Sequence, residues 1–102
     1  MSLLSLFGWG KLKNALQNGA IVIDIRTPNE FDRGKVPDSI NIPSDRFSIN
    51  TERLKNMKQP LIICSNSIYE SGNAVSKLKK AGIREVYNGG TWIDLGKLKQ
   101  KL

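Results

Sequence analysis

Residues Leu61 to Ala74 have the sequence LIICSNSIYESGNA and contain the only cysteine of this 102-residue chain. The apolar run Leu61-Ile62-Ile63 is too short for a buried helix and is typical of a buried strand. Apolar residues return at helical spacing from Ala74 onward. The order strand, Cys64, loop and helix places the thiol where a parallel strand ends and a helix begins, a common location for functional sites. Backbone N–H groups and the helix dipole favour a thiolate there, so the pattern predicts a reactive Cys64 with a lowered pKa.

The composition is that of one ordinary globular domain with an excess of positive charge. Sixteen Lys and Arg oppose nine Asp and Glu, which gives a formal net charge of +7 and favours anionic ligands or acidic partners. The basic residues are scattered and no nucleic-acid-binding motif accompanies them, so nucleic acid is disfavoured as a partner. The chain has no histidine. A Cys–His catalytic pair and a histidine-based metal site are therefore excluded, and we expect no metal.

Residues 1–10 form an apolar arm ahead of the domain predicted for residues 11–102. No basic residue precedes the arm and no small-residue cleavage pattern follows it, so we expect no signal peptide and a cytoplasmic location. The arm is also too short to span a membrane. Two interpretations stay open: the arm packs on the domain, or it binds a partner or a membrane surface, because Lys11 and Lys13 follow it directly. Its apolar side chains belong to Leu3, Leu4, Leu6, Phe7 and Trp9.

Predicted strands and helices alternate through the chain. The nearly continuous apolar run of residues 20–25 predicts a strand buried on both faces. Thr27, Pro28 and Glu30 predict a capping box at the start of a short helix that ends at Gly34. Beyond it we expect a strand over 39–43, a loop over 44–50, a helix over 51–57, a strand over 85–87, a turn at 88–90 and a final helix. This alternation predicts a three-layer α/β domain with a small, mainly parallel sheet.

Asp24 ends the first buried strand and needs a partner. An unpaired carboxylate costs several kcal/mol to bury, so Asp24 is expected to pair with Arg26 or with a loop amide. We expect its role to be structural.

The order of motifs resembles that of a single-domain rhodanese, a family of sulfurtransferases. Three segments carry the resemblance: Ile23–Pro43, Ile62–Cys64 with the loop that follows, and Ala81–Trp92. Together they cover roughly residues 12–96. The resemblance implies the three-layer rhodanese-like fold that the alternation of elements also predicts.

The resemblance also implies a reaction. In this family a cysteine thiolate takes a sulfane sulfur from a donor such as thiosulfate, becomes a persulfide and passes the outer sulfur to a nucleophile, with no cofactor. Carried over, Cys64 is the nucleophile, and Asp24 and Arg26 support the site. The expected partners are a small anionic sulfur donor and a protein sulfur acceptor; the oligomeric state is not predicted. The loop implied to hold the sulfur consists of Ser65, Asn66, Ser67, Ile68, Tyr69, Glu70 and Ser71.

The loop departs from the family pattern Cys-x-x-Gly-x-Arg-Ser. Counted from Cys64 to Ser71 it is one residue longer, it lacks the glycine, and Glu70 stands at the arginine position. The length resembles rhodanese-fold phosphatases and arsenate reductases, but a carboxylate there repels their oxyanions and tends to raise the thiol pKa. Three functions stay open: a sulfurtransferase, a catalytically weakened module for binding or regulation, and a redox-sensing or anion-binding protein. Cys64 itself is either the nucleophile or a buried structural residue.

Overall fold

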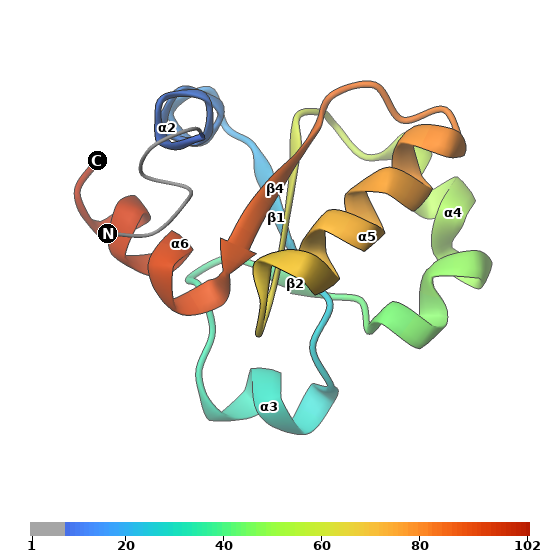
Figure 1. Ribbon diagram of the computed structural model, residues 1–102, viewed down its shortest axis with the longest axis horizontal. Helices are drawn as coiled ribbons and strands as arrows, with labels where there is room; N and C mark the ends of the chain where they lie inside the picture. Colours follow the sequence, from blue (N-terminus) through green and yellow to red (C-terminus); the bar gives the residue numbers. More distant parts are fainter. Residues whose placement is uncertain (1–7) are drawn as a thin grey trace.

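A four-stranded sheet forms the middle layer of the computed structural model, which describes residues 8–102 (Figure 1). Each neighbouring pair of strands is parallel, and their order across the sheet is β2-β1-β3-β4. The predicted α/β fold class with a mainly parallel sheet is therefore confirmed. The strands are β1 (Ile21–Asp24), β2 (Ile40–Asn41), β3 (Leu61–Ser65) and β4 (Val86–Thr91).

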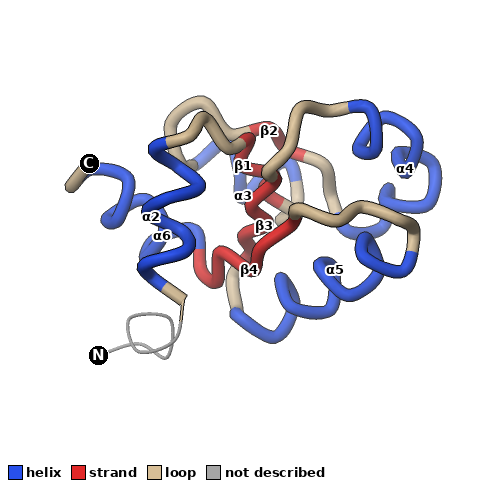
Figure 2. Tube along the Cα trace, turned by 90° about the horizontal axis from the view of Figure 1, so that it is seen from above, coloured by secondary structure: helices blue, strands red, loops and turns tan. Residues whose placement is uncertain are grey.

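Helices cover both faces of the sheet, as the view from above shows (Figure 2). The helices α2 (Trp9–Gln17) and α6 (Trp92–Gln100) lie on one side, and α4 (Phe47–Asn56) and α5 (Ile68–Lys80) lie on the other. The short helix α3 (Pro28–Arg33) lies beyond the carboxyl ends of the strands (Figure 1), and a 3-10 turn (Ser44–Arg46) leads into α4. No helix in the described part of the chain is long and apolar enough to cross a membrane.

The hydrophobic core lies on both faces of the sheet, and β3 contributes side chains to each face, because successive side chains of a strand point to opposite faces. Leu61 and Ile63 pack on the α4/α5 side, whereas Ile62 and Cys64 pack on the α2/α6 side. All five residues of β3 are buried. The α2/α6 side of the core contains Leu12, Ala15, Val22, Val36, Ile62, Cys64, Leu95 and Leu98.

The capping box of α3 forms as the sequence predicts. The Thr27 hydroxyl accepts a hydrogen bond from the Glu30 N–H (3.3 Å), and the Glu30 carboxylate accepts one from the Thr27 N–H (3.2 Å). The helix ends at Arg33, with Gly34 as its C-cap, so the predicted start and end of this element are confirmed.

Two predicted boundaries are wrong. Helix α4 begins at Phe47, within the segment expected to be a loop, because Phe47 packs into the core ahead of Leu54. The glycines expected to make a turn at 88–90 instead lie inside β4. A Cβ on Gly89 would come within 2.6 Å of Ile62 Cγ2, and the β3–β4 register shifts next to it, so this glycine permits a close approach of two strands.

The predicted apolar arm lies mostly outside the described residues. Trp9 and Gly10, which the prediction assigned to the arm, belong to α2. The division of the chain at residue 11 stays a prediction.

Candidate functional site

The first turn of α5 follows β3 almost at once. Only Asn66 and Ser67 separate the two elements, and the Ser67 hydroxyl caps the helix by accepting a hydrogen bond from the Glu70 N–H (3.1 Å). The prediction of a long sulfur-holding loop is wrong in this respect. Four of its members, Ile68, Tyr69, Glu70 and Ser71, form the first turn of α5.

Cys64 does not face this turn. Its side chain is fully buried, with a relative exposure of 0%, and packs on the α2/α6 side of the sheet. Burial raises the pKa of the Cys64 thiol far above its usual value; the charge of Asp24 raises it further, and that of Arg26 opposes the shift. The lowered thiol pKa expected at a helix N-terminus is therefore wrong, because side chains alternate along β3 and that of Cys64 points to the face opposite α5. The role of Cys64 as the nucleophile stays a prediction.

Ser65 is the strand-end residue that faces α5. Its side chain is buried, and its hydroxyl donates a hydrogen bond to Glu70 Oε2 at 2.6 Å. The segment from Ser65 to Ser71 has the seven-residue length of the pattern Cys-x-x-Gly-x-Arg-Ser, so no insertion is required. Ser65 then stands at the cysteine position, Ile68 at the glycine position and Glu70 at the arginine position. The sequence analysis assigned Ser65 to the sulfur-holding loop and not to the cysteine position, because it aligned the only cysteine of the chain with that position.

Asn66 and Tyr69, which lie on either side of the Ser67 cap, point in different directions. Asn66 Nδ2 donates a hydrogen bond to Glu30 Oε2 at 2.7 Å, which joins the start of α5 to the capping box of α3. This bond, together with those from Thr27, lowers the pKa of Glu30. Tyr69 is 77% exposed and leaves the turn toward solvent.

Asn88 holds the first turn of α5 against β4. The buried Ser71 hydroxyl donates to Asn88 Oδ1, and Asn88 Nδ2 donates to the Ile68 carbonyl at 3.1 Å. Asn88 also accepts a hydrogen bond from the Gly90 N–H at 2.9 Å. The sequence analysis missed Asn88 because it placed this residue in a turn.

Asp24 and Arg26 form the expected buried pair. The guanidinium binds the carboxylate through Nη2 (2.7 Å) and Nε (3.0 Å), and both side chains are almost completely buried. Arg26 also donates to the Gly34 carbonyl at 2.6 Å and lies 4.2 Å from the ring centre of Trp92. The pair thus ties β1 to the loop after α3 and to α6, which agrees with the predicted supporting role.

A cavity of about 190 Å³ opens beside Glu70, on the α4/α5 side of the sheet. Its lining is part apolar and part charged, with Glu70 and Lys77 contributed by α5. Among residues 8–102, no cluster of three or more Cys, Asp or Glu side chains could hold a metal ion. The cavity is lined by Ile25, Ser44, Phe47, Glu70, Asn73, Ala74 and Lys77.

A family model described as the rhodanese-like domain matches residues 9–91. The chain belongs to the rhodanese-like domain family. Its parallel sheet and the order of its motifs are those that the sequence resemblance implied, so that resemblance is confirmed. Membership places the chain among sulfurtransferase-like proteins, without assigning it a donor or a reaction.

Known relatives of this rhodanese-like domain agree with the assignment. The uncharacterized protein YqhL of Bacillus subtilis (strain 168) is 37% identical over 84 residues, covering 80% of this chain and 66% of YqhL. The chain thus spans just under two thirds of that relative. A solved structure of SSP1007 from Staphylococcus saprophyticus aligns with a TM-score of 0.70 at 22% identity, covering 85% of this chain and 88% of that one. The rhodanese-like domain of Anabaena sp. Alr3790 aligns with a TM-score of 0.68 at 19% identity, covering 86% and 72%.

We expect Cys64 to resist alkylation in the native protein. The Cys64 thiol is fully buried, so a reagent cannot reach it, and its raised pKa keeps it protonated, so little thiolate is present to react. Iodoacetamide at neutral pH should therefore react with Cys64 only after the protein is unfolded in urea. Mass spectrometry with and without urea measures this directly, and raising the pH to about 9, where an exposed cysteine is largely thiolate, should change the native result little. Rapid labelling without denaturant would show that Cys64 reaches solvent.

Proposed function

We propose that this rhodanese-like domain is a binding module without sulfurtransferase activity. The observation that carries the proposal is the hydrogen bond from Ser65 to Glu70 at the site where the family pattern has its cysteine and arginine. Sulfane sulfur transfer requires a thiolate that attacks the donor sulfur, forms an S–S bond and releases the remainder of the donor as an anion. A serine hydroxyl cannot form that S–S bond.

Glu70 further opposes a small anionic sulfur donor. Its carboxylate lies beside the Ser65 hydroxyl, where the donor would have to approach. Two unit charges about 6 Å apart repel by about 3 kcal/mol at an effective dielectric near 20, and solvent at this exposed carboxylate reduces the value. The same repulsion disfavours the phosphatase and arsenate reductase alternatives.

Cys64 does not replace the missing nucleophile. It is buried on the α2/α6 side of the sheet, whereas the cavity beside Glu70 is on the α4/α5 side. Sulfur transfer through Cys64 to a protein acceptor, the competing hypothesis, is supported by family membership but needs a rearrangement of β3. We propose that the cavity and the exposed Tyr69, which precedes the cavity residue Glu70 in α5, bind a protein partner instead, because exposed aromatic side chains are typical contributors to protein interfaces. A cytoplasmic location stays a prediction.

Intact-mass spectrometry after incubation with thiosulfate tests this proposal. We expect the wild-type protein to gain no sulfur atom and to show no thiosulfate:cyanide transfer above buffer. The Cys64→Ala variant is the matched control and should behave identically. A sulfur adduct on the wild type that is absent from Cys64→Ala would establish the sulfurtransferase function and contradict the proposal of a binding module without this activity.

A further inference from the structure

The cavity beside Glu70 is the middle part of a longer groove. It shares Ser44, Phe47 and Lys77 with a hollow of about 250 Å³ that follows α5 toward its C-terminal end. It shares Ser44 with another hollow, of about 240 Å³, that extends toward the start of α3. Because Ser44 lines all three, they adjoin between α5 and the 3-10 turn that leads into α4. We refer to the three adjoining hollows as the α4/α5 groove.

The α4/α5 groove has an apolar interior. The buried side chains that line it are those of Ile25, Phe47, Ala74 and Leu78, whereas its charged side chains are exposed. A buried apolar centre with a polar rim is the usual arrangement in protein interfaces. The middle hollow measures about 190 Å³. One aromatic or large aliphatic side chain fits such a space, because a protein cavity of about 150 Å³ holds benzene.

Two opposite charges flank the middle hollow. Glu70 and Lys77 both line it from positions seven apart on α5, which is about 10.5 Å along the helix axis. Both side chains are exposed, and neither forms an ion pair within residues 8–102. Glu70 uses Oε2 to accept the hydrogen bond from Ser65, which leaves Oε1 for a partner. A bound segment can therefore meet one negative and one positive charge.

The α4/α5 groove is electrically balanced, although the chain has a formal net charge of +7. Among its lining residues, Asp45 and Glu70 offset Arg46 and Lys77. A nucleic acid binds through an excess of positive charge at its phosphates, which this lining does not supply. The groove instead suits an apolar segment that carries charges of both signs.

We propose that the α4/α5 groove binds an extended peptide segment of a protein partner. One large apolar side chain of the segment occupies the middle hollow, a basic side chain pairs with Glu70 and an acidic side chain pairs with Lys77. This inference rests on the proposed binding function and specifies the partner.

The geometry of an extended chain sets the spacing of the three side chains. Alternate residues of such a chain share a face and lie about 6.6 Å apart. Charged residues two positions before and after the apolar one are therefore about 13 Å apart, a separation that flexible side chains can match to the distance between Glu70 and Lys77. The expected pattern is basic-x-apolar-x-acidic, read in either chain direction.

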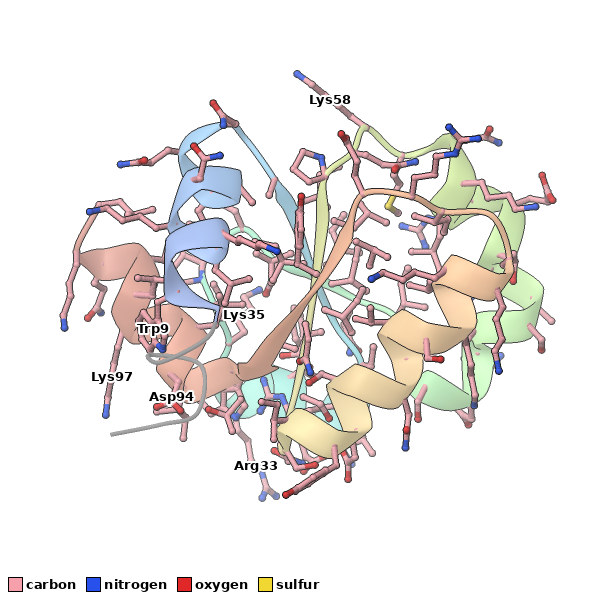
Figure 3. All side chains as sticks on the ribbon, turned by 45° about the horizontal axis from the view of Figure 1, so that its top comes forward. Trp9, Arg33, Lys35, Lys58, Asp94 and Lys97 are labelled. Carbon is pink, nitrogen blue, oxygen red and sulfur yellow. The ribbon has the colours of Figure 1, made fainter. Side chains whose placement is uncertain are left out.

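Selection from a library of random peptides displayed on phage, with the full chain as bait, tests the proposal. We expect the wild type to enrich peptides that have this pattern. Glu70→Lys should change the pattern to acidic residues at both charged positions, and Lys77→Glu should change it to basic residues at both. Lys58→Glu is the matched control and should enrich the wild-type pattern, because Lys58 projects into solvent from the segment ahead of β3 (Figure 3).

Fluorescence anisotropy with the most enriched peptide measures the affinity. Lys77→Glu should weaken binding by about tenfold or more, because attraction becomes repulsion. Ser44→Trp fills the point where the three hollows adjoin, keeps every charge and should weaken binding by about tenfold or more. Ser76→Trp is the matched control, since Ser76 is exposed on α5 but does not line the groove, and it should bind as the wild type does. Circular dichroism verifies that each variant is folded.

The outcomes separate this inference from the proposed function. Enriched peptides that ignore both charge changes and Ser44→Trp would overturn the inference and leave a protein-binding role for Tyr69. Enrichment of no peptide would also overturn it. Self-association of the chain that Ser44→Trp abolishes, without peptide binding, would assign the groove to a second copy instead. A sulfur adduct on the wild type, measured separately, would contradict the proposed function itself.

Discussion

The double variant Ser65→Cys/Glu70→Arg is expected to gain sulfur-transfer activity that we propose the wild type lacks. The new thiol would stand where the Ser65 hydroxyl now faces the first turn of α5, beside the helix N-terminus that lowers a thiol pKa. Replacing Glu70 with Arg turns repulsion of thiosulfate into attraction. We expect one added sulfur atom by mass spectrometry and a thiosulfate:cyanide rate at least 100-fold above the wild-type background.

Single variants separate the two contributions. Ser65→Cys alone should accept sulfur with a KM at least tenfold higher, because the Glu70 carboxylate remains, and the difference should shrink at high salt. Glu70→Arg alone is the matched control and should stay inactive. If the double variant is alkylated readily yet takes up no sulfur, this end of β3 is not a sulfur site and the comparison with the family pattern fails.

Asp24→Ala is expected to reduce the free energy of unfolding by about 3–5 kcal/mol, the range found when one partner of a buried ion pair is removed. Arg26 would keep its buried charge without its ion-pair partner, and its contacts with the Gly34 carbonyl and the Trp92 ring would not replace the Asp24 carboxylate. Urea denaturation followed by circular dichroism measures the change.

Two control variants test whether the loss of stability in Asp24→Ala comes from the buried charge of Arg26. The double variant Asp24→Leu/Arg26→Met removes both charges and should be less destabilised than Asp24→Ala. Glu52→Ala breaks the exposed pair with Lys55, separated by 3.7 Å, and should alter stability by no more than about 0.5 kcal/mol. A similarly small effect for Asp24→Ala would mean that its carboxylate reaches water.

Features that depend on neighbours in the chain were predictable from the sequence. The α3 capping box follows from Thr27 and Glu30 alone, because its hydrogen bonds join residues three positions apart. The β1 strand follows from a continuous apolar run, and the Asp24–Arg26 pair from a buried carboxylate with a cation two residues away. The order of such elements was sufficient to predict the fold class.

The site that we propose is centred on Ser65, one residue after the Cys64 that the sequence analysis predicted as the nucleophile. A strand reverses the direction of successive side chains, so a shift of one position between Cys64 and Ser65 moves the site across the sheet. Counting six residues back from Ser71 along the family pattern would have identified Ser65. The prediction instead aligned the family's cysteine with Cys64, because Cys64 is the only cysteine of the chain.

By itself, then, the sequence determined the order of strands and helices, the capping of α3 and the need of Asp24 for a partner, because local spacing and the cost of burying a charge decide these. The start of α4 and the inclusion of Gly89 and Gly90 in β4 depended on tertiary packing. Only the tertiary structure decided which face of β3 meets α5. That choice depends on the packing of Ile62 and Cys64 against α2 and α6, elements distant in the chain. The same packing buries the thiol and leaves the Ser65 hydroxyl beside Glu70.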